Sequence, residues 1–218
     1  MRSGPALAGI GSIAFSVLTI VGLAVANPPG GTYKAADAAK YVAKGHHAAV
    51  FVSAYLFLLA VLGLLCLLAY LRDLISATAE GARVARFFWA TGVAAAASFA
   101  VGWALVVGNA IAHAYGGRSV VIPPTVTYLA SELGFVVIFG PAAILLGFAL
   151  ITLMFGARMT LPGWLRWSTL VAGLGGVASL AWFPSFLLIA WGIVIGIWLL
   201  LTSRRPDAAR APAGPTAA

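Results

Sequence analysis

The chain has 218 residues, of which 62% are hydrophobic and only 8% are charged, and its mean hydropathy is +1.04. Soluble domains are about half apolar, so this composition excludes a water-soluble fold and indicates a membrane protein. The formal charge of +8 does not indicate nucleic-acid binding, because the basic residues are scattered between apolar runs and form no basic face.

Six apolar runs predict transmembrane helices, each of which needs about 20 residues. They cover roughly residues 6–26, 47–71, 87–113, 127–155, 164–183 and 186–202. We therefore predict an all-α fold, a polytopic transmembrane helical bundle of six spans that forms one domain over residues 1–203. The last two runs are separated by Phe183-Pro184-Ser185, which predicts a tight antiparallel hairpin or one broken element, so a five-span count is the alternative.

The first run, residues 6–26, has two interpretations. Its position after MRS and its end at Ala24-Val25-Ala26 are typical of a secretory signal peptide. Its apolar part covers about 20 residues, whereas that of a signal peptide usually covers about 7 to 15. We therefore expect the run to be retained as a span.

Residues 27–46 are expected to lie outside the hydrocarbon. They begin with the turn residues NPPGG and continue with helix-favouring alanines, which predicts a short interfacial helix. Tyr33 and Tyr41 suit the headgroup level. Later in the chain, Gly140-Pro141 predicts a kink in the fourth span, and the basic, Pro- and Ala-rich residues 204–218 predict a disordered cytoplasmic tail.

The orientation follows from Lys and Arg, which concentrate in cytoplasmic connections. One side carries Arg2, Arg72, Arg83, Arg86, Arg158, Arg166, Arg204, Arg205 and Arg210, and the other carries Lys34, Lys40, Lys44 and Arg118. We therefore expect both termini in the cytoplasm and residues 27–46 outside, in a multi-pass protein of a bacterial cytoplasmic membrane.

Pairs of small residues at i and i+4 predict close helix packing, because backbone approach supplies attraction between helices in lipid. These pairs are Ser98 with Gly102, Ala172 with Gly176, and Gly192 with Gly196. We expect them to seal the bundle of one chain. A dimer face, which would make the chain a homo-oligomer, is the alternative.

The polar residues near span ends gather on the predicted outer side. His46 and His47 begin span two, Asn109 and His113 lie one turn apart at the end of span three, and Glu132 opens span four. Spans two and four are long enough without them, so we expect these residues to lie at the membrane border.

Other interpretations give this cluster a function. If spans two, three and four pack together, His46 or His47 with His113 and Glu132 would form a divalent-metal site at the outer mouth. A polar cluster without metal, a proton acceptor at Glu132, and a pH-responsive element are the alternatives. No other cofactor is predicted, since metalloprotease, serine-hydrolase and P-loop motifs are absent from the sequence.

One stretch carries a resemblance. PPGGTYKAADAAKYVAKGHHAAVFVSAYLFLLAVLGLLCLLAYLRDL, residues 28–74, resembles uncharacterised multi-pass membrane proteins common in high-GC actinobacteria. The likeness covers mainly the outer segment and span two. It implies a cellular setting and carries no information about catalysis.

We expect a non-enzymatic membrane protein, either transporter-like or an accessory subunit. A membrane enzyme or metal-binding protein that uses the outer cluster is the alternative. The expected partners are the lipid bilayer and a further membrane protein or a second copy of the chain.

Overall fold

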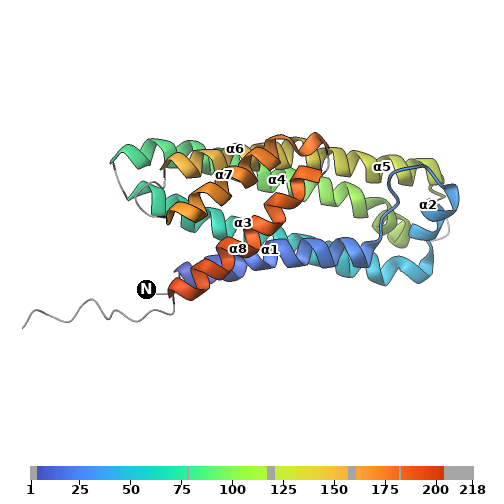
Figure 1. Ribbon diagram of the computed structural model, residues 1–218. Helices are drawn as coiled ribbons and strands as arrows, with labels where there is room; N and C mark the ends of the chain where they lie inside the picture. The colour runs from blue at the N-terminus through green and yellow to red at the C-terminus, as the bar shows by residue number, and fades with distance from the viewer. Residues whose placement is uncertain (1–3, 78, 117–120, 157–160, 182, 204–218) are drawn as a thin grey trace, which may run out of the picture.

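The chain folds as an elongated bundle of helices (Figure 1). The computed structural model describes residues 4–77, 79–116, 121–156, 161–181 and 183–203. The helices in these ranges are α1 (Gly4–Ala26), α2 (Ala35–Tyr41), η1 (Lys44–His46), α3 (His47–Ser76), α4 (Ala79–Gly116), α5 (Pro124–Val137), η3 (Ile138–Ala142), α6 (Ala143–Gly156), α7 (Gly163–Val177), η4 (Ser179–Ala181), η5 (Phe183–Ser185) and α8 (Phe186–Ser203). The described ranges contain no strand, so the predicted all-α bundle is confirmed. The predicted tail, residues 204–218, lies outside them.

Five helices of the described chain are long and apolar enough to cross a membrane. They are α1, α3, α4 from Gly81, the continuous rod α5–η3–α6, and α8. A helix satisfies its own backbone hydrogen bonds, which lipid requires because it offers no partners for them. The length and composition of these five helices are compatible with an integral membrane protein.

The fifth predicted span, residues 164–183, does not form one long helix. α7 has 15 residues and is about 22 Å long, shorter than the hydrocarbon core of about 30 Å. The apolar residues after it form the short turns η4 and η5, and α8 then returns towards the end of the bundle where α7 began (Figure 1). Pro184 lies in η5 and has no backbone N–H to continue a helix. The two runs form the predicted hairpin, but only α8 is counted among the helices of crossing length.

The kink predicted in the fourth span is present at Gly140, whose ψ of −110° lies outside the helical range. Pro141 removes a backbone donor there, and the chain forms the π-helical turn η3. The hydroxyl of Ser179 in η4 donates to the carbonyl of Phe139. The tip of the α7–α8 hairpin is thereby attached to the kink.

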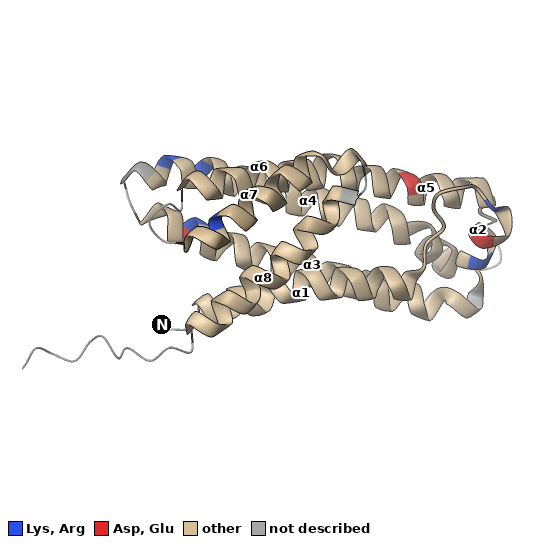
Figure 2. Ribbon diagram, viewed as in Figure 1, with Lys and Arg blue, Asp and Glu red and all other residues tan. Residues whose placement is uncertain are grey.

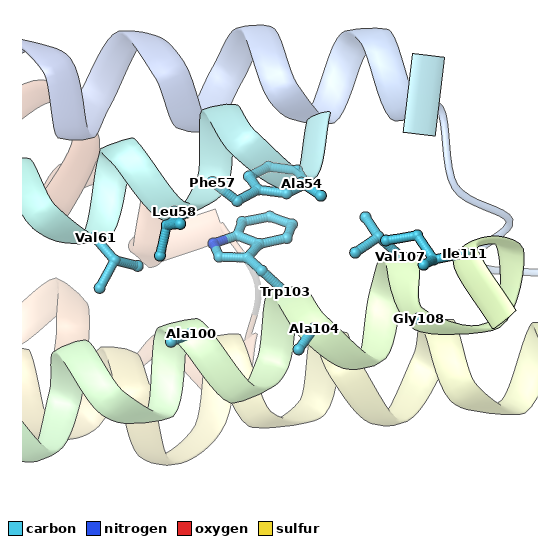
Figure 3. Close-up of a pocket in the computed structure, with 10 residues that line it drawn as sticks. All are labelled: Ala54, Phe57, Leu58, Val61, Ala100, Trp103, Ala104, Val107, Gly108 and Ile111. Carbon is cyan, nitrogen blue, oxygen red and sulfur yellow. The ribbon is translucent and has the colours of Figure 1, made fainter. Parts of the chain in front are cut away.

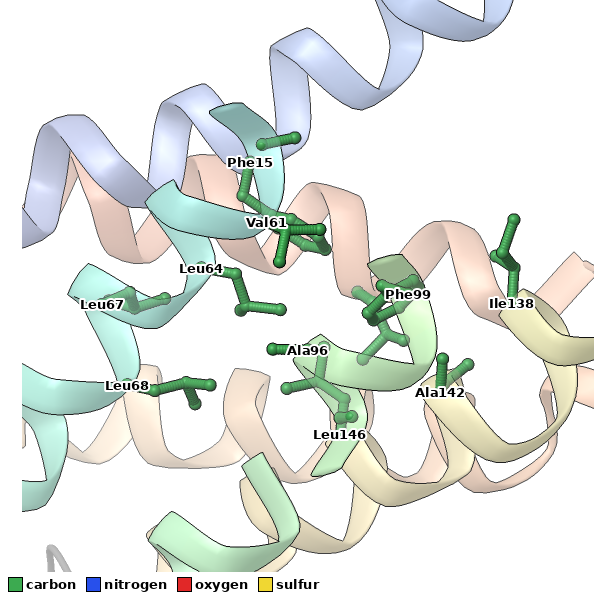
Figure 4. Packing of buried hydrophobic residues seen from close by; sticks show 14 of the residues in the cluster. Phe15, Val61, Leu64, Leu67, Leu68, Ala96, Phe99, Ile138, Ala142 and Leu146 are labelled. Carbon is green, nitrogen blue, oxygen red and sulfur yellow. The ribbon is translucent and has the colours of Figure 1, made fainter. Parts of the chain in front are cut away.

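Apolar side chains from α1, α3, α4, η3 and α6 meet in one core (Figure 4). Leu64 of α3 and Leu146 of α6 are completely or almost completely buried, and Phe15 of α1 packs edge-to-face on Phe99 of α4 with ring centroids 5.7 Å apart. These contacts join helices that are distant in the sequence.

The glycines of α8 lie against α1. A Cβ added to Gly196 would come within 2.9 Å of the carbonyl oxygen of Gly9, which leaves no room for a side chain. The hydroxyl of Ser12 in α1 donates to the carbonyl of Gly192 over 2.6 Å. Close approach and a buried hydrogen bond therefore act together at this interface.

The other predicted small residues also lie in the bundle: Ser98 and Gly102 on α4, and Ala172 and Gly176 on α7. A Cβ on Gly102 would lie 2.9 Å from the carbonyl oxygen of Gly134 in α5, and one on Gly176 would lie 2.7 Å from that of Ala143 in α6. Ala172 is buried, whereas Ser98 is only half-buried.

Charged side chains of the described residues lie at the two ends of the bundle (Figure 2). The end where α1 begins also holds the end of α3 with Arg72, the start of α4 with Arg83 and Arg86, and the start of α7 with Arg166. We call it the arginine end. The opposite end holds α2, which contains Asp37 and Lys40 and follows Lys34, and Glu132 of α5 is hydrogen-bonded to Gly31 of the preceding loop. Long apolar helices connect these two polar ends, as expected for a protein that spans lipid.

Contacts between glycine backbones predict the effect of adding a methyl group. A Cβ on Gly11 of α1 would lie 2.6 Å from the carbonyl oxygen of Gly63 in α3, whereas one on Gly108 meets nothing within 4 Å. Gly11→Ala should lower the free energy of unfolding by about 1–3 kcal/mol through overpacking. Gly108→Ala should be neutral or stabilise by up to about 1 kcal/mol through helix propensity. Unfolding in detergent, followed by circular dichroism, measures both, and equal effects would contradict this packing.

Candidate functional site

The polar end opposite the arginine end has a folded covering, which we call the α2 cap. It consists of residues 27–47, 106–116 and 121–135. The chain leaves α1 through Asn27 and passes Gly31, and both residues have positive φ angles, of 42° and 73°. Asn and Gly adopt this left-handed conformation more readily than other residues. The NPPGG turn can therefore bend back over the ends of α3, α4 and α5.

Two side chains of α5 hold this turn. A carboxylate oxygen of Glu132 accepts a hydrogen bond from the backbone N–H of Gly31 over 2.8 Å. The hydroxyl of Tyr128, one helical turn before Glu132, donates to the carbonyl of the same glycine. Tyr33 packs edge-to-face on Tyr128, with ring centroids 5.1 Å apart. Glu132 and Tyr128 therefore hold the NPPGG turn against α5.

His46 and His47 bind backbone carbonyls of neighbouring segments. Nε2 of His46 lies 2.7 Å from the carbonyl oxygen of Ala26, the last residue of α1, and Nε2 of His47 lies 2.9 Å from that of Val42. A carbonyl only accepts, so Nε2 must carry the proton and donate in both rings. The carbonyl of Ala26 has no partner within its own helix, and His46 supplies one.

The structure brings His47, rather than His46, next to His113. Their ring centroids are 5.7 Å apart in an edge-to-face arrangement, while the ring of His46 lies beside Tyr41 at 5.4 Å. Nδ1 of His113 is buried without a hydrogen-bond partner among the described residues. Within the described chain, no three His, Cys, Asp or Glu side chains are grouped as a metal site.

Asn109 and Tyr41 join other parts of the α2 cap to the bundle. The amide of Asn109 in α4 donates to the carbonyl of Val126 in α5 over 3.2 Å. The hydroxyl of Tyr41 in α2 donates to the carbonyl of Val106 in α4 over 3.1 Å. Burial raises the pKa of the Tyr41 phenol, because the anion would lose its hydration. The phenol therefore stays protonated and keeps donating at physiological pH.

A polar hollow of about 300 Å³ lies between the NPPGG turn, α2 and η1. Asn27, Asp37, Lys40 and His46 contribute polar groups to its walls. Oppositely charged side chains at one opening favour a small polar solute or a headgroup over an apolar molecule.

A second hollow, of about 330 Å³, lies between α3 and α4 and is apolar (Figure 3). Phe57 and Trp103 stack in it with ring centroids 3.9 Å apart and planes within 4° of parallel. Ala100, Ala104 and Gly108 line the α4 side, where their small size leaves the space open. This groove offers no charged group for catalysis.

The chain matches no known protein family, no curated protein and no solved structure. The geometry of the α2 cap and of the hollows is therefore the basis for assigning a function.

Three residues of the α2 cap were not among the sequence candidates: Gly31, Tyr41 and Tyr128. Tyr128 and Glu132 are four residues apart and so share a helix face, which is a signal in the sequence. Their common partner is 97 residues or more away in the chain, and no local pattern identifies it.

The loop contact predicts a difference between two substitutions of one residue. Glu132→Ala removes the acceptor for the Gly31 N–H, whereas Glu132→Gln keeps an oxygen there. A net hydrogen bond contributes about 1 kcal/mol, so exchange of the Gly31 amide hydrogen should become about 5-fold faster in Glu132→Ala. Glu132→Gln should stay close to the native rate. Hydrogen-exchange mass spectrometry of a peptide over residues 28–33 measures this, and equal rates in all three proteins would contradict the contact.

Proposed function

We propose that the chain is a non-enzymatic membrane protein of accessory type, which acts through its α2 cap. The observation that carries this proposal is the distribution of charge: the described Lys, Arg, Asp and Glu residues lie at the two ends, with apolar helices between them (Figure 2). A carrier usually binds its substrate with polar groups near the middle of the bilayer. The described spans offer no charged residue for that purpose.

Hydrogen bonds of α8 with α1 and with α7 support the same proposal. The hydroxyls of Ser16 and Thr169 donate to the backbone carbonyls of Ile189 and Leu165. The indole N–H of Trp191 donates in turn to the Thr169 hydroxyl over 2.9 Å. These polar groups hold helices together and are already engaged.

We further propose that the α2 cap faces the outside of a bacterial cytoplasmic membrane. Among the described residues, the arginine end has four basic residues and the α2 cap has three, Lys34, Lys40 and Lys44. Arg72 at the arginine end also packs on Trp89, 5.5 Å from the centre of its ring. Positive charge is favoured on the cytoplasmic side of short connections. The cap would then meet a partner domain or a solute outside the cell.

A second candidate function uses the histidine pair. His47 and His113 lie in ring contact, and Nδ1 of His113 is buried without a partner among the described residues. Protonation of both rings would place two positive charges side by side, which would push α3 and α4 apart at this end. A bound metal ion would instead engage a free ring nitrogen. The α2 cap would then be a pH-responsive or metal-binding element.

Cysteine accessibility tests the accessory proposal and its orientation together. In a Cys66→Ala background, single cysteines replace Lys40, Arg83, Ser16 or Thr169. A membrane-impermeant maleimide should label position 40 on intact cells and position 83 only after permeabilisation. Positions 16 and 169 should stay unlabelled in both cases, because both side chains are completely buried. Reversed labelling of 40 and 83 would invert the topology, and labelling of 16 or 169 from water would favour a carrier.

Metal content tests the second candidate. If the histidine pair holds a metal, purified protein should carry close to one zinc, copper or iron ion per chain. His113→Ala combined with Glu132→Gln should abolish that content. Elemental analysis of both proteins after dialysis measures it. The absence of metal from the native protein, or its unchanged content in the double variant, would remove the metal interpretation.

A further inference from the structure

The α7–α8 hairpin is shorter than the helices around it. α8 has 18 residues and is about 27 Å long, whereas the rod α5–η3–α6 has 33 residues and is about 50 Å long. The tip of the hairpin lies at the kink, where Ser179 donates to the Phe139 carbonyl. Between the tip and the α2 cap, α1 and α5 have no hairpin helix beside them (Figure 1).

A cavity of about 220 Å³ lies at this tip. Its walls come from four parts of the chain: Phe15 and Leu23 of α1, Phe99 of α4, Phe139 of η3, and Phe186 at the start of α8. Phe15 and Phe99, which also belong to the core in Figure 4, form its inner side. Ala143 of α6 and Ser185 of η5 complete the lining, so segments far apart in the sequence enclose the cavity.

The cavity opens sideways, away from both polar ends. Ile20 of α1 and Phe186 of α8 belong to its rim, and their side chains are 51% and 61% exposed. Neither α1 nor α8 contains a charged residue within its described bounds. The surface around the opening therefore faces the hydrocarbon of the bilayer.

We propose that this cavity binds the hydrocarbon chain of a membrane lipid. Water is disfavoured, because its walls are almost entirely apolar and water needs several polar partners. A transmembrane helix is about 10 Å wide and does not fit such a small volume. A lipid chain matches the walls in polarity and is supplied by the surrounding bilayer. The proposal does not depend on the accessory function of the α2 cap.

The position of the cavity along α1 defines its depth in the bilayer. Thr19 lines the cavity and lies seven residues, or about 10 Å, before the end of α1 at Ala26. A chain that enters from the leaflet beside the α2 cap would therefore reach the cavity with its middle carbons. Its headgroup would remain at the level of the NPPGG turn.

Photocrosslinking locates the chain. The full-length protein is reconstituted in phosphatidylcholine vesicles that contain a phosphatidylglycerol with a diazirine at the middle of one acyl chain. After illumination, mass spectrometry should find adducts enriched at residues 15–23 and 185–189. Adducts spread evenly over lipid-exposed residues such as Leu129 and Leu133, or concentrated in the α3–α4 groove of Figure 3, would overturn the proposal.

A matched pair of variants tests the cavity itself. Thr19→Phe fills it, and loses no hydrogen bond because the Thr19 hydroxyl has no partner among the described residues. Val21→Phe adds a ring to the same helix, where the side chain is 41% exposed and does not line the cavity. Adducts in the enriched region should fall at least about 5-fold in Thr19→Phe and stay unchanged in Val21→Phe. An equal yield in both folded variants would overturn the proposal, and the native adduct map decides it if Thr19→Phe does not fold.

Discussion

The structure depends on one constraint, which is that lipid and not water surrounds the spans. Lipid offers no partners for backbone polar groups, so the described membrane-crossing elements are helices that satisfy their own N–H and C=O groups. Attraction between helices then comes from close backbone approach and from hydroxyls that bind carbonyls. The contact of Gly196 with Gly9 and the hydrogen bond from Ser12 to Gly192 are examples between α1 and α8.

The same constraint explains the kinked region. Pro141 interrupts helical hydrogen bonding inside the bilayer, where a free carbonyl would be costly. Ser179 at the tip of the hairpin gives a partner to Phe139. The short hairpin is thus held beside η3, and the lateral cavity lies where its helices end. Kink, hairpin and cavity form one connected feature.

The α2 cap is surrounded by water and lipid headgroups instead of hydrocarbon. Polar side chains can therefore hold a loop in place there. Glu132 and Tyr128 hold Gly31, and His46 binds the end of α1. These contacts account for most of the residues that the sequence marked as a candidate site. The polar hollow beside Lys40 and the histidine pair are the parts of the cap left to interact with another molecule.

The sequence by itself determined the membrane environment, the helical fold, the kink at Gly140 and the turn at NPPGG, because hydropathy, proline and glycine act locally. It also placed the polar residues of the α2 cap near span ends. Only the tertiary structure decided that His113 meets His47, that Glu132 binds Gly31, and that α7 is too short to cross. Those outcomes depend on packing between segments far apart in the chain, which no local pattern encodes.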